Sequence, residues 1–502
     1  MDILSNLLIG FSVALEPINI FYGLIGALIG TAVGVLPGLG TVATIALLLP
    51  VTYQLEPVSA VIMLAGIFYG AQYGGSTTAI LLNIPGEASS VTTTLDGYQM
   101  ARQGRAGPAL GICAIGSFIG GTIGVIGLCI AAPLLADMAL QFGPPEYFAL
   151  VLLGLMMVIY LAEGSIIKGV LMGFLGLFAG TIGLDPVTGT ERFTFGITEL
   201  RDGLDLVPVA MGLFGISELM LNIERPEARD VLRSAVRDLL PTRQDWNRAW
   251  KAIVRGSLFG FFAGILPGGG ATISSFMSYG LEKRLSKTPE RFGRGAIEGV
   301  AAPESANNAA STSSFIPLLT LGIPGNLSTA MILVALMIHG IQPGPLMMSE
   351  HPDLFWGVIA SMYVGNIILL CLNLPMITLW VRLLHTPYHY LALLIVVVCV
   401  VGAYSVTYSA FSVLVMVVFG VFGYITRRYN FPPAPFILAM ILGPMLEKSL
   451  QQSLIAEGAD LSVFITRPIS ATILVIGLAL AMKPLLLLLV RSRATNASAS
   501  GQ

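Results

Sequence analysis

The chain has 502 residues, of which 55% are hydrophobic and only 11% are charged. A soluble protein carries roughly 25% charged residues, so the charges here cannot cover a water-exposed surface. The net charge of −2 provides no basic surface for nucleic acid. The composition therefore excludes a soluble enzyme and a nucleic-acid-binding protein, and it predicts an all-α polytopic membrane protein.

Apolar stretches recur along the chain at the length of a membrane crossing. A transmembrane helix needs about 20 mostly apolar residues. We therefore expect crossings at about 57–82, 106–136, 147–162, 165–184, 203–221, 300–345 (interrupted), 354–381, 388–404, 409–426, 432–447 and 468–490.

The charges predict how the chain is divided and oriented. A polar, arginine-rich stretch at about 222–250 separates two halves, and the positive-inside rule places this linker and the C-terminus in the cytoplasm. The charges do not fix the side of the N-terminus. We expect a first repeat at 1–221, the cytoplasmic linker at 222–250, a second repeat at 251–447, and an extra transmembrane helix with a cytoplasmic tail at 448–502.

Two apolar segments break in the middle at a Pro-Gly sequence. They lie at about 18–50 and 253–282, and their breaks read Leu36-Pro37-Gly38-Leu39-Gly40 and Leu266-Pro267-Gly268-Gly269-Gly270. Ten helical residues on either side of a break span about 15 Å, half of the membrane. The segments are thus predicted to be re-entrant hairpins, the first entering from outside and the second, with basic flanks, from inside.

The two halves resemble each other in sequence. The pattern G-[VI]-L-P-G-x-G occurs at 34–40 and again at 264–270, and 83–89 (NIPGEAS) resembles 322–328 (GIPGNLS). Each half holds one hairpin and about five crossings, and an odd number of crossings gives two halves opposite orientations. Two inverted-topology repeats with broken helices are typical of secondary transporters, although a channel can share such a fold.

The four Pro-Gly breaks are the candidate substrate-binding positions. Irregular backbone at membrane depth is tolerated only where it lines a cavity or is buried in protein, and half-helix N-termini bind anions. Small residues also pack transmembrane helices closely, which is the alternative role of an isolated Gly or Ser. The predicted substrate-binding residues are Pro37, Gly38, Gly40, Thr41, Pro85, Gly86, Ser89, Pro267, Gly268, Gly270, Thr272, Pro324, Gly325, Asn326 and Ser328.

Polar runs beside the breaks are candidate cation ligands, because half-helix carbonyls and side-chain oxygens suit Na⁺. The predicted cation-binding residues are Ser76, Thr77, Asn83, Glu304, Asn307, Asn308, Ser311 and Thr312. Glu87, Asp96 and Glu298 also lie near the breaks, and a capping role competes with a direct one for these acids. We expect no transition metal, because the cysteines are isolated and the pair His385 and His389 has no acidic partner.

These motifs resemble those of a known family. Both G-[VI]-L-P-G-x-G turns, the stretch at 69–78 (YGAQYGGSTT), Asn83-Ile-Pro-Gly86 and Pro303-Glu-Ser-Ala-Asn-Asn308 are similar to the large membrane subunit of bacterial tripartite tricarboxylate transporters (TctA-type). The resemblance covers residues from about 15 to 490.

The resemblance implies a permease of the bacterial inner membrane that imports a citrate-like tricarboxylate or another carboxylate. It implies two partners, a small membrane subunit of about four spans and a periplasmic solute-binding protein. An Na⁺ or H⁺ gradient would drive import, without another cofactor. The sequence leaves open the substrate, the coupling ion and whether the chain forms a homodimer. The alternatives are an uncoupled anion channel and, more remotely, an intramembrane enzyme, for which no GxSxG sequence is present.

Overall fold

The computed structural model describes residues 3–36, 40–161, 165–185, 188–224, 239–268, 270–384 and 388–479. This part of the chain is almost entirely helical, as predicted for an all-α protein. It divides into two compact units, one formed by Met1–Leu140 with Leu206–Ile425 and the other by Gln141–Asp205 with Thr426–Gln502. Each unit thus combines segments from both halves of the sequence.

The first unit contains both broken segments. Its helices up to residue 224 are α1 (Ile3–Ala14), α2 (Pro17–Val35), α3 (Thr41–Thr52), α4 (Pro57–Leu82), η1 (Ala88–Ser90), α5 (Val91–Arg102), α6 (Ala106–Ala139), α9 (Leu206–Ala210), η3 (Met211–Ile216) and α10 (Ser217–Glu224). The later helices are α11 (Arg243–Ile265), α12 (Gly270–Leu285), η4 (Pro289–Arg291), α13 (Glu298–Ser313), α14 (Phe315–Leu321), α15 (Leu327–Ile338), α16 (Met347–Glu350), α17 (Pro352–Asn373), α18 (Ile377–Leu383), α19 (Tyr388–Thr407) and α20 (Ala410–Arg428).

The second unit contains the helices α7 (Pro144–Leu161), α8 (Ile166–Gly180), η2 (Thr198–Leu200), α21 (Pro433–Ala456) and α22 (Val463–Thr466), and a further helix at Pro468–Ala479. The strands β1 (Gly183–Leu184) and β2 (Glu191–Arg192) pair antiparallel. Ion pairs join its chain segments, with Arg192 2.6 Å from Glu447 and Arg467 2.8 Å from Glu146. The chain forms a multi-pass membrane protein, because six described helices are long and apolar enough to cross a bilayer: α2, α4, α6, Leu206–Glu224, α17 and α20.

Several helices differ in length from the sequence expectation. The first arms of the two broken segments, α2 and α11, have 19 and 23 residues, well beyond the ten expected for each. Helix α11 begins at Arg243, because Thr242 and Asp245 form a capping box there although the apolar residues start later. The apolar pattern therefore marks which part of a helix is buried, but not where the helix begins. The arginines at 225–237 lie outside the described residues.

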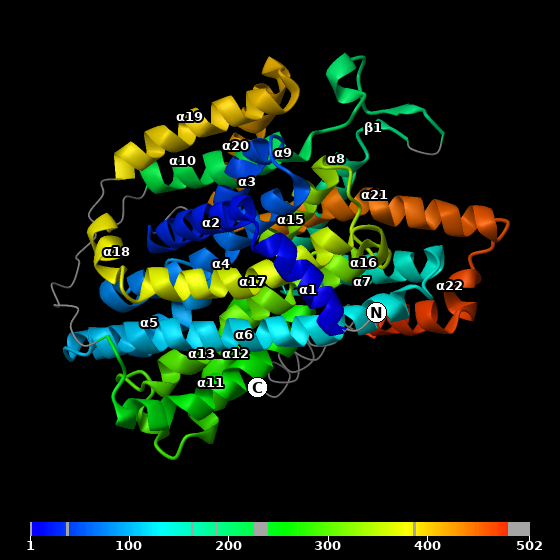
Figure 1. Cartoon of the computed structure of the whole chain (residues 1–502). Helices are drawn as coiled ribbons and strands as arrows, with labels where there is room; N and C mark the ends of the chain where they lie inside the picture. The colour runs from blue at the N-terminus through cyan, green and yellow to red at the C-terminus, as the bar shows by residue number, and fades with distance from the viewer. Residues whose placement is uncertain are drawn as a thin grey trace, which may run out of the picture. The chain divides into compact units, whose positions relative to one another are not determined.

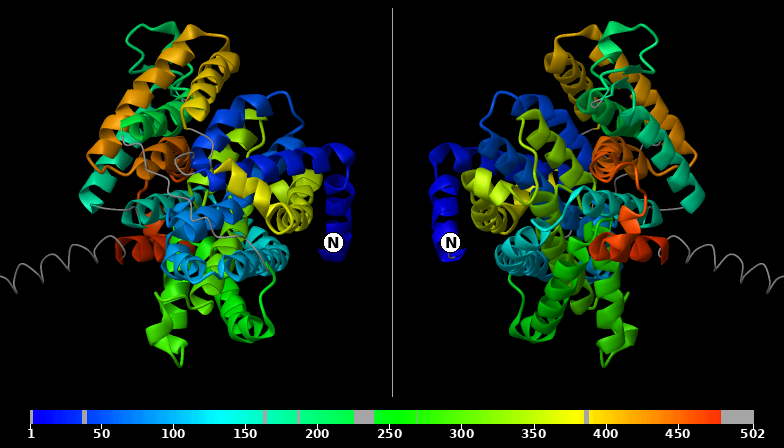
Figure 2. Two further views of the ribbon diagram at one scale, coloured as in Figure 1. Left: turned by 90° about the vertical axis from the view of Figure 1, so that its left-hand side faces the viewer. Right: turned by 90° about the vertical axis from the view of Figure 1, so that its right-hand side faces the viewer.

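Close helix contacts form the centre of the first unit. Figure 1 shows α6 running between the α4–α17 group and the α11–α13 group, and Figure 2 shows α1 standing beside α17 at the edge. Helix α2 packs on α4 so tightly that a Cβ at Gly26, Gly30 or Gly34 would lie 2.2 to 2.3 Å from a carbonyl oxygen of α4. A Cβ at Gly256, Gly260 or Gly264 of α11 would lie 2.1 to 2.4 Å from a carbonyl oxygen of α13. Both pairs use glycines four residues apart, as closely packed membrane helices do.

Candidate functional site

In the first half, the end of α2 and the start of α3 lie against the break after α4. Asn83 ends α4 in the left-handed conformation, with φ +58°. Gly86 then packs so closely that a Cβ there would lie 1.9 Å from the carbonyl oxygen of Gly34. These contacts place Glu87 at the N-terminus of α3. Its Oε1 accepts hydrogen bonds from the backbone N–H of Thr41, at 3.1 Å, and from the Thr41 hydroxyl.

The second half repeats this arrangement with a different residue. Gly322 ends α14 with φ +70°, and the N–H of Gly268 in the α11–α12 break donates to the carbonyl of Gly325 at 2.8 Å. Asn326 occupies the position corresponding to Glu87, and a Cβ at Gly270, the first residue of α12, would lie 3.9 Å from the Asn326 Cβ. Both Glu87 and Asn326 head capping boxes, with Ser90 and Thr329 respectively.

The two halves meet at these breaks. Ser275 of α12 donates to the carbonyl of Ser89 at 2.6 Å, and its hydroxyl lies 2.9 Å from that of Thr92. Helix α15 packs on α3 in turn. The structure therefore brings together the described residues of all four predicted breaks. Pro37 and Gly38 lie outside the described residues.

The N-termini of α3 and α12 differ in charge. Glu87 supplies a carboxylate to α3, so the N–H of its first residue is satisfied from within the chain. At α12 the corresponding side chain is an amide, and within the described part of the chain the buried Asn326 Nδ2 has no hydrogen-bond partner. A helix N-terminus carries a partial positive charge that favours an anion. The α12 N-terminus and Asn326 are thus a set of donors without an acidic partner of the kind that α3 has.

The remaining predicted substrate-binding residues have varied surroundings. Ser89 is buried and donates its hydroxyl to Gln72, so this hydroxyl is used inside the protein. Thr272 lies half-buried in the first turn of α12, and Ser328 is buried in the first turn of α15. Gly40, Pro85, Pro267 and Pro324 contribute backbone shape at the breaks, where no side-chain donor is available from these residue types.

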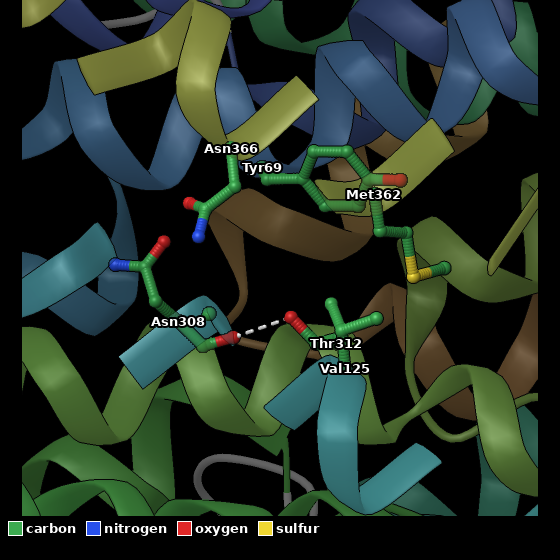
Figure 3. Close-up of a pocket in the computed structure, with 7 residues that line it drawn as sticks. Tyr69, Val125, Asn308, Thr312, Met362 and Asn366 are labelled. Atoms are coloured by element: carbon green, nitrogen blue, oxygen red, sulfur yellow. Dashed lines mark hydrogen bonds between the residues drawn. The ribbon is translucent and has the colours of Figure 1, made fainter. Parts of the chain in front are cut away.

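A small cavity with polar and apolar walls lies between α4, α6, α13 and α17. It is lined by Tyr69, Gly121, Val125, Asn308, Thr312, Met362 and Asn366. Figure 3 shows the amides of Asn308 and Asn366 pointing toward each other across it. The Tyr69 hydroxyl is buried there without a partner, whereas Asn366 donates to the carbonyl of Phe118 at 2.8 Å and accepts from Tyr73 at 2.6 Å.

The predicted cation ligands do not all lie at one place. Asn308 and Thr312 line the cavity of Figure 3, while Ser76 and Thr77 line a second cavity along α4. The hydroxyls of Ser311 and Thr312 donate to carbonyls one turn back in α13, at 2.8 and 3.0 Å. Asn83 is exposed at the end of α4.

Glu304 is the predicted ligand with the most unusual environment. It is completely buried, and it accepts hydrogen bonds from the Thr93 hydroxyl and, at 3.4 Å, from the Asn307 amide. Among the described residues no Lys or Arg pairs with it. An ionised carboxylate in such a place needs a compensating positive charge.

Asp96 has a structural role, which was one of the two readings of the acids near the breaks. Its Oδ1 accepts from the N–H groups of Gly293, Gly295 and Ala296 at 2.8 to 2.9 Å, and its Oδ2 accepts from Tyr279 at 2.9 Å. This carboxylate therefore fixes the loop before α13 to α5.

An ion pair fixes the base of α11. Arg105 lies 2.5 Å from Asp245, which also accepts from the hydroxyl and N–H of Thr242. Burial alone would raise the pKa of Asp245, but the hydrogen bonds from Arg105 and Thr242 and the charge of Arg105 lower it overall.

Three functional candidates were missed from the sequence: Tyr69, Ser117 and Asn373. Ser117 and Asn373 are isolated polar residues within apolar helices, whereas Tyr69 begins the stretch at 69–78 that was used only for the family resemblance. Within the described ranges no three His, Cys, Asp or Glu residues are grouped as metal ligands would be. The side chains of His385 and His389 fall outside those ranges.

Residues 20–438 match the family described as the Tripartite tricarboxylate transporter TctA family. An uncharacterized 52.8 kDa protein from the TAR-I ttuC′ 3′ region of Agrobacterium vitis is 52% identical over 479 residues, which are 95% of each chain. A protein from the TAR-II ttuC′ 3′ region of the same organism is 50% identical over 219 residues, covering 44% of this chain and 90% of that one. No solved structure matches.

Proposed function

This chain belongs to the Tripartite tricarboxylate transporter TctA family, and we propose that it carries a carboxylate into the bacterial cytoplasm through the region of the four breaks. Members of this family are the large membrane subunits of three-part transporters. Its partners are then a small membrane subunit and a periplasmic solute-binding protein. Membership of a transporter family implies that the chain is not an enzyme.

The observation that supports this proposal is the difference between the two breaks, where Glu87 lies beside the N-terminus of α3 and the amide of Asn326 takes the corresponding position beside α12. We propose that a substrate carboxylate binds at the N-terminus of α12 and accepts hydrogen bonds from its backbone N–H groups and from the Asn326 Nδ2, which has no partner among the described residues. Thr272 and Ser328 add hydroxyl donors in the first turns of α12 and α15. The N-terminus of α3 is already neutralised by Glu87.

The same contacts fit a tricarboxylate such as citrate and other small carboxylates, because N–H and hydroxyl groups recognise the carboxylate itself. We propose that the two halves are inverted repeats whose hairpins enter the membrane from opposite sides. The matching glycine contacts of α2 on α4 and of α11 on α13 support a duplicated unit.

Import of an anion requires coupling to an ion gradient. Moving one negative charge inward against 100 mV costs about 2.3 kcal/mol, so a dianion or trianion costs roughly 5–7 kcal/mol. We propose that Na⁺ or H⁺ enters with the substrate and offsets this cost. An uncoupled anion channel, the alternative, would instead let the anion follow its own electrochemical gradient.

Uptake of labelled citrate into proteoliposomes tests the proposal. The vesicles contain this chain and its small partner, and the binding protein is added outside with an inward Na⁺ gradient, an inward H⁺ gradient or neither. We expect uptake that requires the binding protein and one of the gradients. Binding-protein-independent flux without a gradient would contradict the proposal and favour the channel.

A pair of glycine variants connects uptake to the break. Gly268 has φ +76°, a backbone conformation that a residue with a branched side chain rarely adopts. Its N–H donates a hydrogen bond to the carbonyl of Gly325. Gly280 lies on α12 with nothing within 4 Å of its Cβ position. We expect Gly268→Val to abolish uptake and Gly280→Val to retain it, with both proteins present in the membrane. Normal uptake by Gly268→Val would count against a role for this break.

A further inference from the structure

Three buried side-chain oxygens that have no hydrogen-bond partner of ordinary geometry among the described residues surround one small cavity. They are the Ser76 Oγ on α4, the Ser117 Oγ on α6 and the Asn373 Oδ1 at the end of α17. The three residues are only 2%, 1% and 5% exposed. Buried polar atoms are normally hydrogen-bonded, so three such atoms from three helices at one cavity indicate that the site accommodates a ligand.

The local bonding turns oxygen atoms toward this cavity. The Asn373 Nδ2 donates to the carbonyl of Leu369 at 2.9 Å, which leaves the amide oxygen as its unpaired end. Most hydroxyls in neighbouring helices donate to a carbonyl one turn back, as Thr122 does at 2.7 Å, but Ser76 and Ser117 do not. The cavity has room for about one water-sized particle.

A buried carboxyl group lies next to the cavity. The carboxylate of Glu304 acts electrostatically on Tyr73 and Cys113, which both line it, and Ser76 faces this carboxylate as well. No Lys or Arg is among the residues that line the cavity. A cation bound here would compensate the buried charge of Glu304, which has no other ion-pair partner among the described residues.

We propose that this cavity binds one Na⁺, held by Ser76, Ser117 and Asn373 and balanced by Glu304. Hydroxyl and amide oxygens are hard ligands suited to an alkali cation, and the absence of grouped His, Cys, Asp or Glu in the described ranges is unlike a transition-metal site. Binding itself stands on these contacts alone, whereas its use as the coupling site rests on the proposed function.

The site lies next to the cavity of Figure 3. Tyr69 and Tyr73 are one helical turn apart on α4, and Tyr69 lines the cavity of Figure 3 while Tyr73 lines the Na⁺ cavity. The hydrogen bond from Tyr73 to Asn366 joins the walls of both. Occupation of the Na⁺ cavity therefore acts directly on a wall of the cavity of Figure 3.

Saturable binding of radiolabelled Na⁺ to the purified full chain, in choline buffer without any carboxylate, tests this site. The informative variants are Ser76→Ala and Ser117→Ala, which each remove one oxygen from the wall of the cavity. The matched control is Ser361→Ala on α17, which removes a buried hydroxyl bonded to the carbonyl of Val358 at 2.7 Å. Thermal unfolding in Na⁺-free buffer verifies that each variant is folded.

We expect one Na⁺ per chain, an affinity at least tenfold weaker in Ser76→Ala and in Ser117→Ala, and an unchanged affinity in Ser361→Ala. Absence of saturable binding by the wild-type chain would overturn the site, as would equal affinities in all three variants. Because no carboxylate is present, Na⁺ binding by a chain that shows binding-protein-independent flux without a gradient would support this site and contradict the proposed function alone.

Discussion

The two broken-helix pairs are built alike and differ in the charge of one residue. Glu87 and Asn326 hold the same place, each heading a capping box directly after a Pro-Gly sequence. Glu87 reaches across to the N-terminus of α3 and bonds to Thr41, while the Asn326 Nδ2 has no partner at the N-terminus of α12. The N-terminus of α3 thus has a carboxylate of the chain beside it, whereas Asn326 supplies an amide at the matching position beside α12.

The largest expected effect contrasts the two glycines before these residues. A Cβ at Gly86 would lie 1.9 Å from the carbonyl oxygen of Gly34, whereas the atom nearest to a Cβ at Gly325 is 3.2 Å away. Gly86→Ala should therefore destabilise the protein by about 3 kcal/mol or more, and Gly325→Ala by less than about 1 kcal/mol. Thermal unfolding of both variants in detergent measures the difference. Equal stability of the two would show that the first break is packed more loosely than described.

The next effect comes from making the second break resemble the first. Asn326→Asp keeps a good N-cap residue and adds a negative charge where a substrate carboxylate is proposed to bind. Repulsion between like charges costs several kcal/mol, so uptake should fall by about 100-fold or more without loss of folded protein.

Asn326→Ser is the matched control, because it keeps a capping oxygen and adds no charge. It should lose only the Nδ2 donor and retain uptake within about tenfold of wild type. Uptake that survives Asn326→Asp undiminished would exclude this residue from the substrate site.

A smaller effect follows from removing the charge at the first break. Glu87→Gln keeps the shape of the side chain but weakens its charge-assisted hydrogen bonds with Thr41, which should cost about 1–2 kcal/mol of stability. Uptake should stay within a few-fold of wild type, because Glu87 is proposed to neutralise α3 and not to contact substrate. Loss of uptake in a stably folded Glu87→Gln protein would place Glu87 in the transport pathway.

The smallest effect concerns the N-termini of α11 and α2, the first helices of the two broken segments. The α11 base has the Arg105–Asp245 ion pair, while Glu16 at the N-cap of α2 makes no capping hydrogen bond. Because the pKa of Asp245 is lowered in the folded protein, its stabilisation is present above the unfolded pKa of about 3.9 and is lost as pH falls through the folded pKa. Arg105 is partly exposed and screened, so the contribution is about 1 kcal/mol or less.

Unfolding temperatures of wild type and Asp245→Asn between neutral pH and about pH 3 measure this contribution. The wild type should lose its advantage over the variant as the pH falls. A difference that stays constant across the pH range would show that Asp245 does not contribute through its charge.

The sequence predicted the positions of the breaks because Pro and Gly act locally. Asn83 and Gly322 adopt left-handed conformations at the ends of α4 and α14, directly before the two Pro-Gly sequences. The helix bounds of α4 were predicted within the stretch 57–82 for the same reason, since Pro57 and Asn83 delimit it. The family assignment was confirmed by the family match over residues 20–438.

The sequence could not predict which side chains contact one another, because these contacts depend on packing between segments that are distant in the chain. Glu87 was noted only as an acid near a break, and its contact with Thr41 requires α2 to pack on α4. Ser117 and Asn373 lie far from Ser76 in the sequence, so no local pattern connects them. The first turn of α11 was missed because Thr242 and Asp245 precede the apolar stretch.

An experimental density map of this chain with its small partner and bound citrate tests the central claim most directly. The account predicts density for a carboxylate at the first turn of α12, within hydrogen-bond distance of the Asn326 amide, and Glu87 still bonded to Thr41 at α3. Citrate density at the N-terminus of α3, with Glu87 displaced, would contradict it.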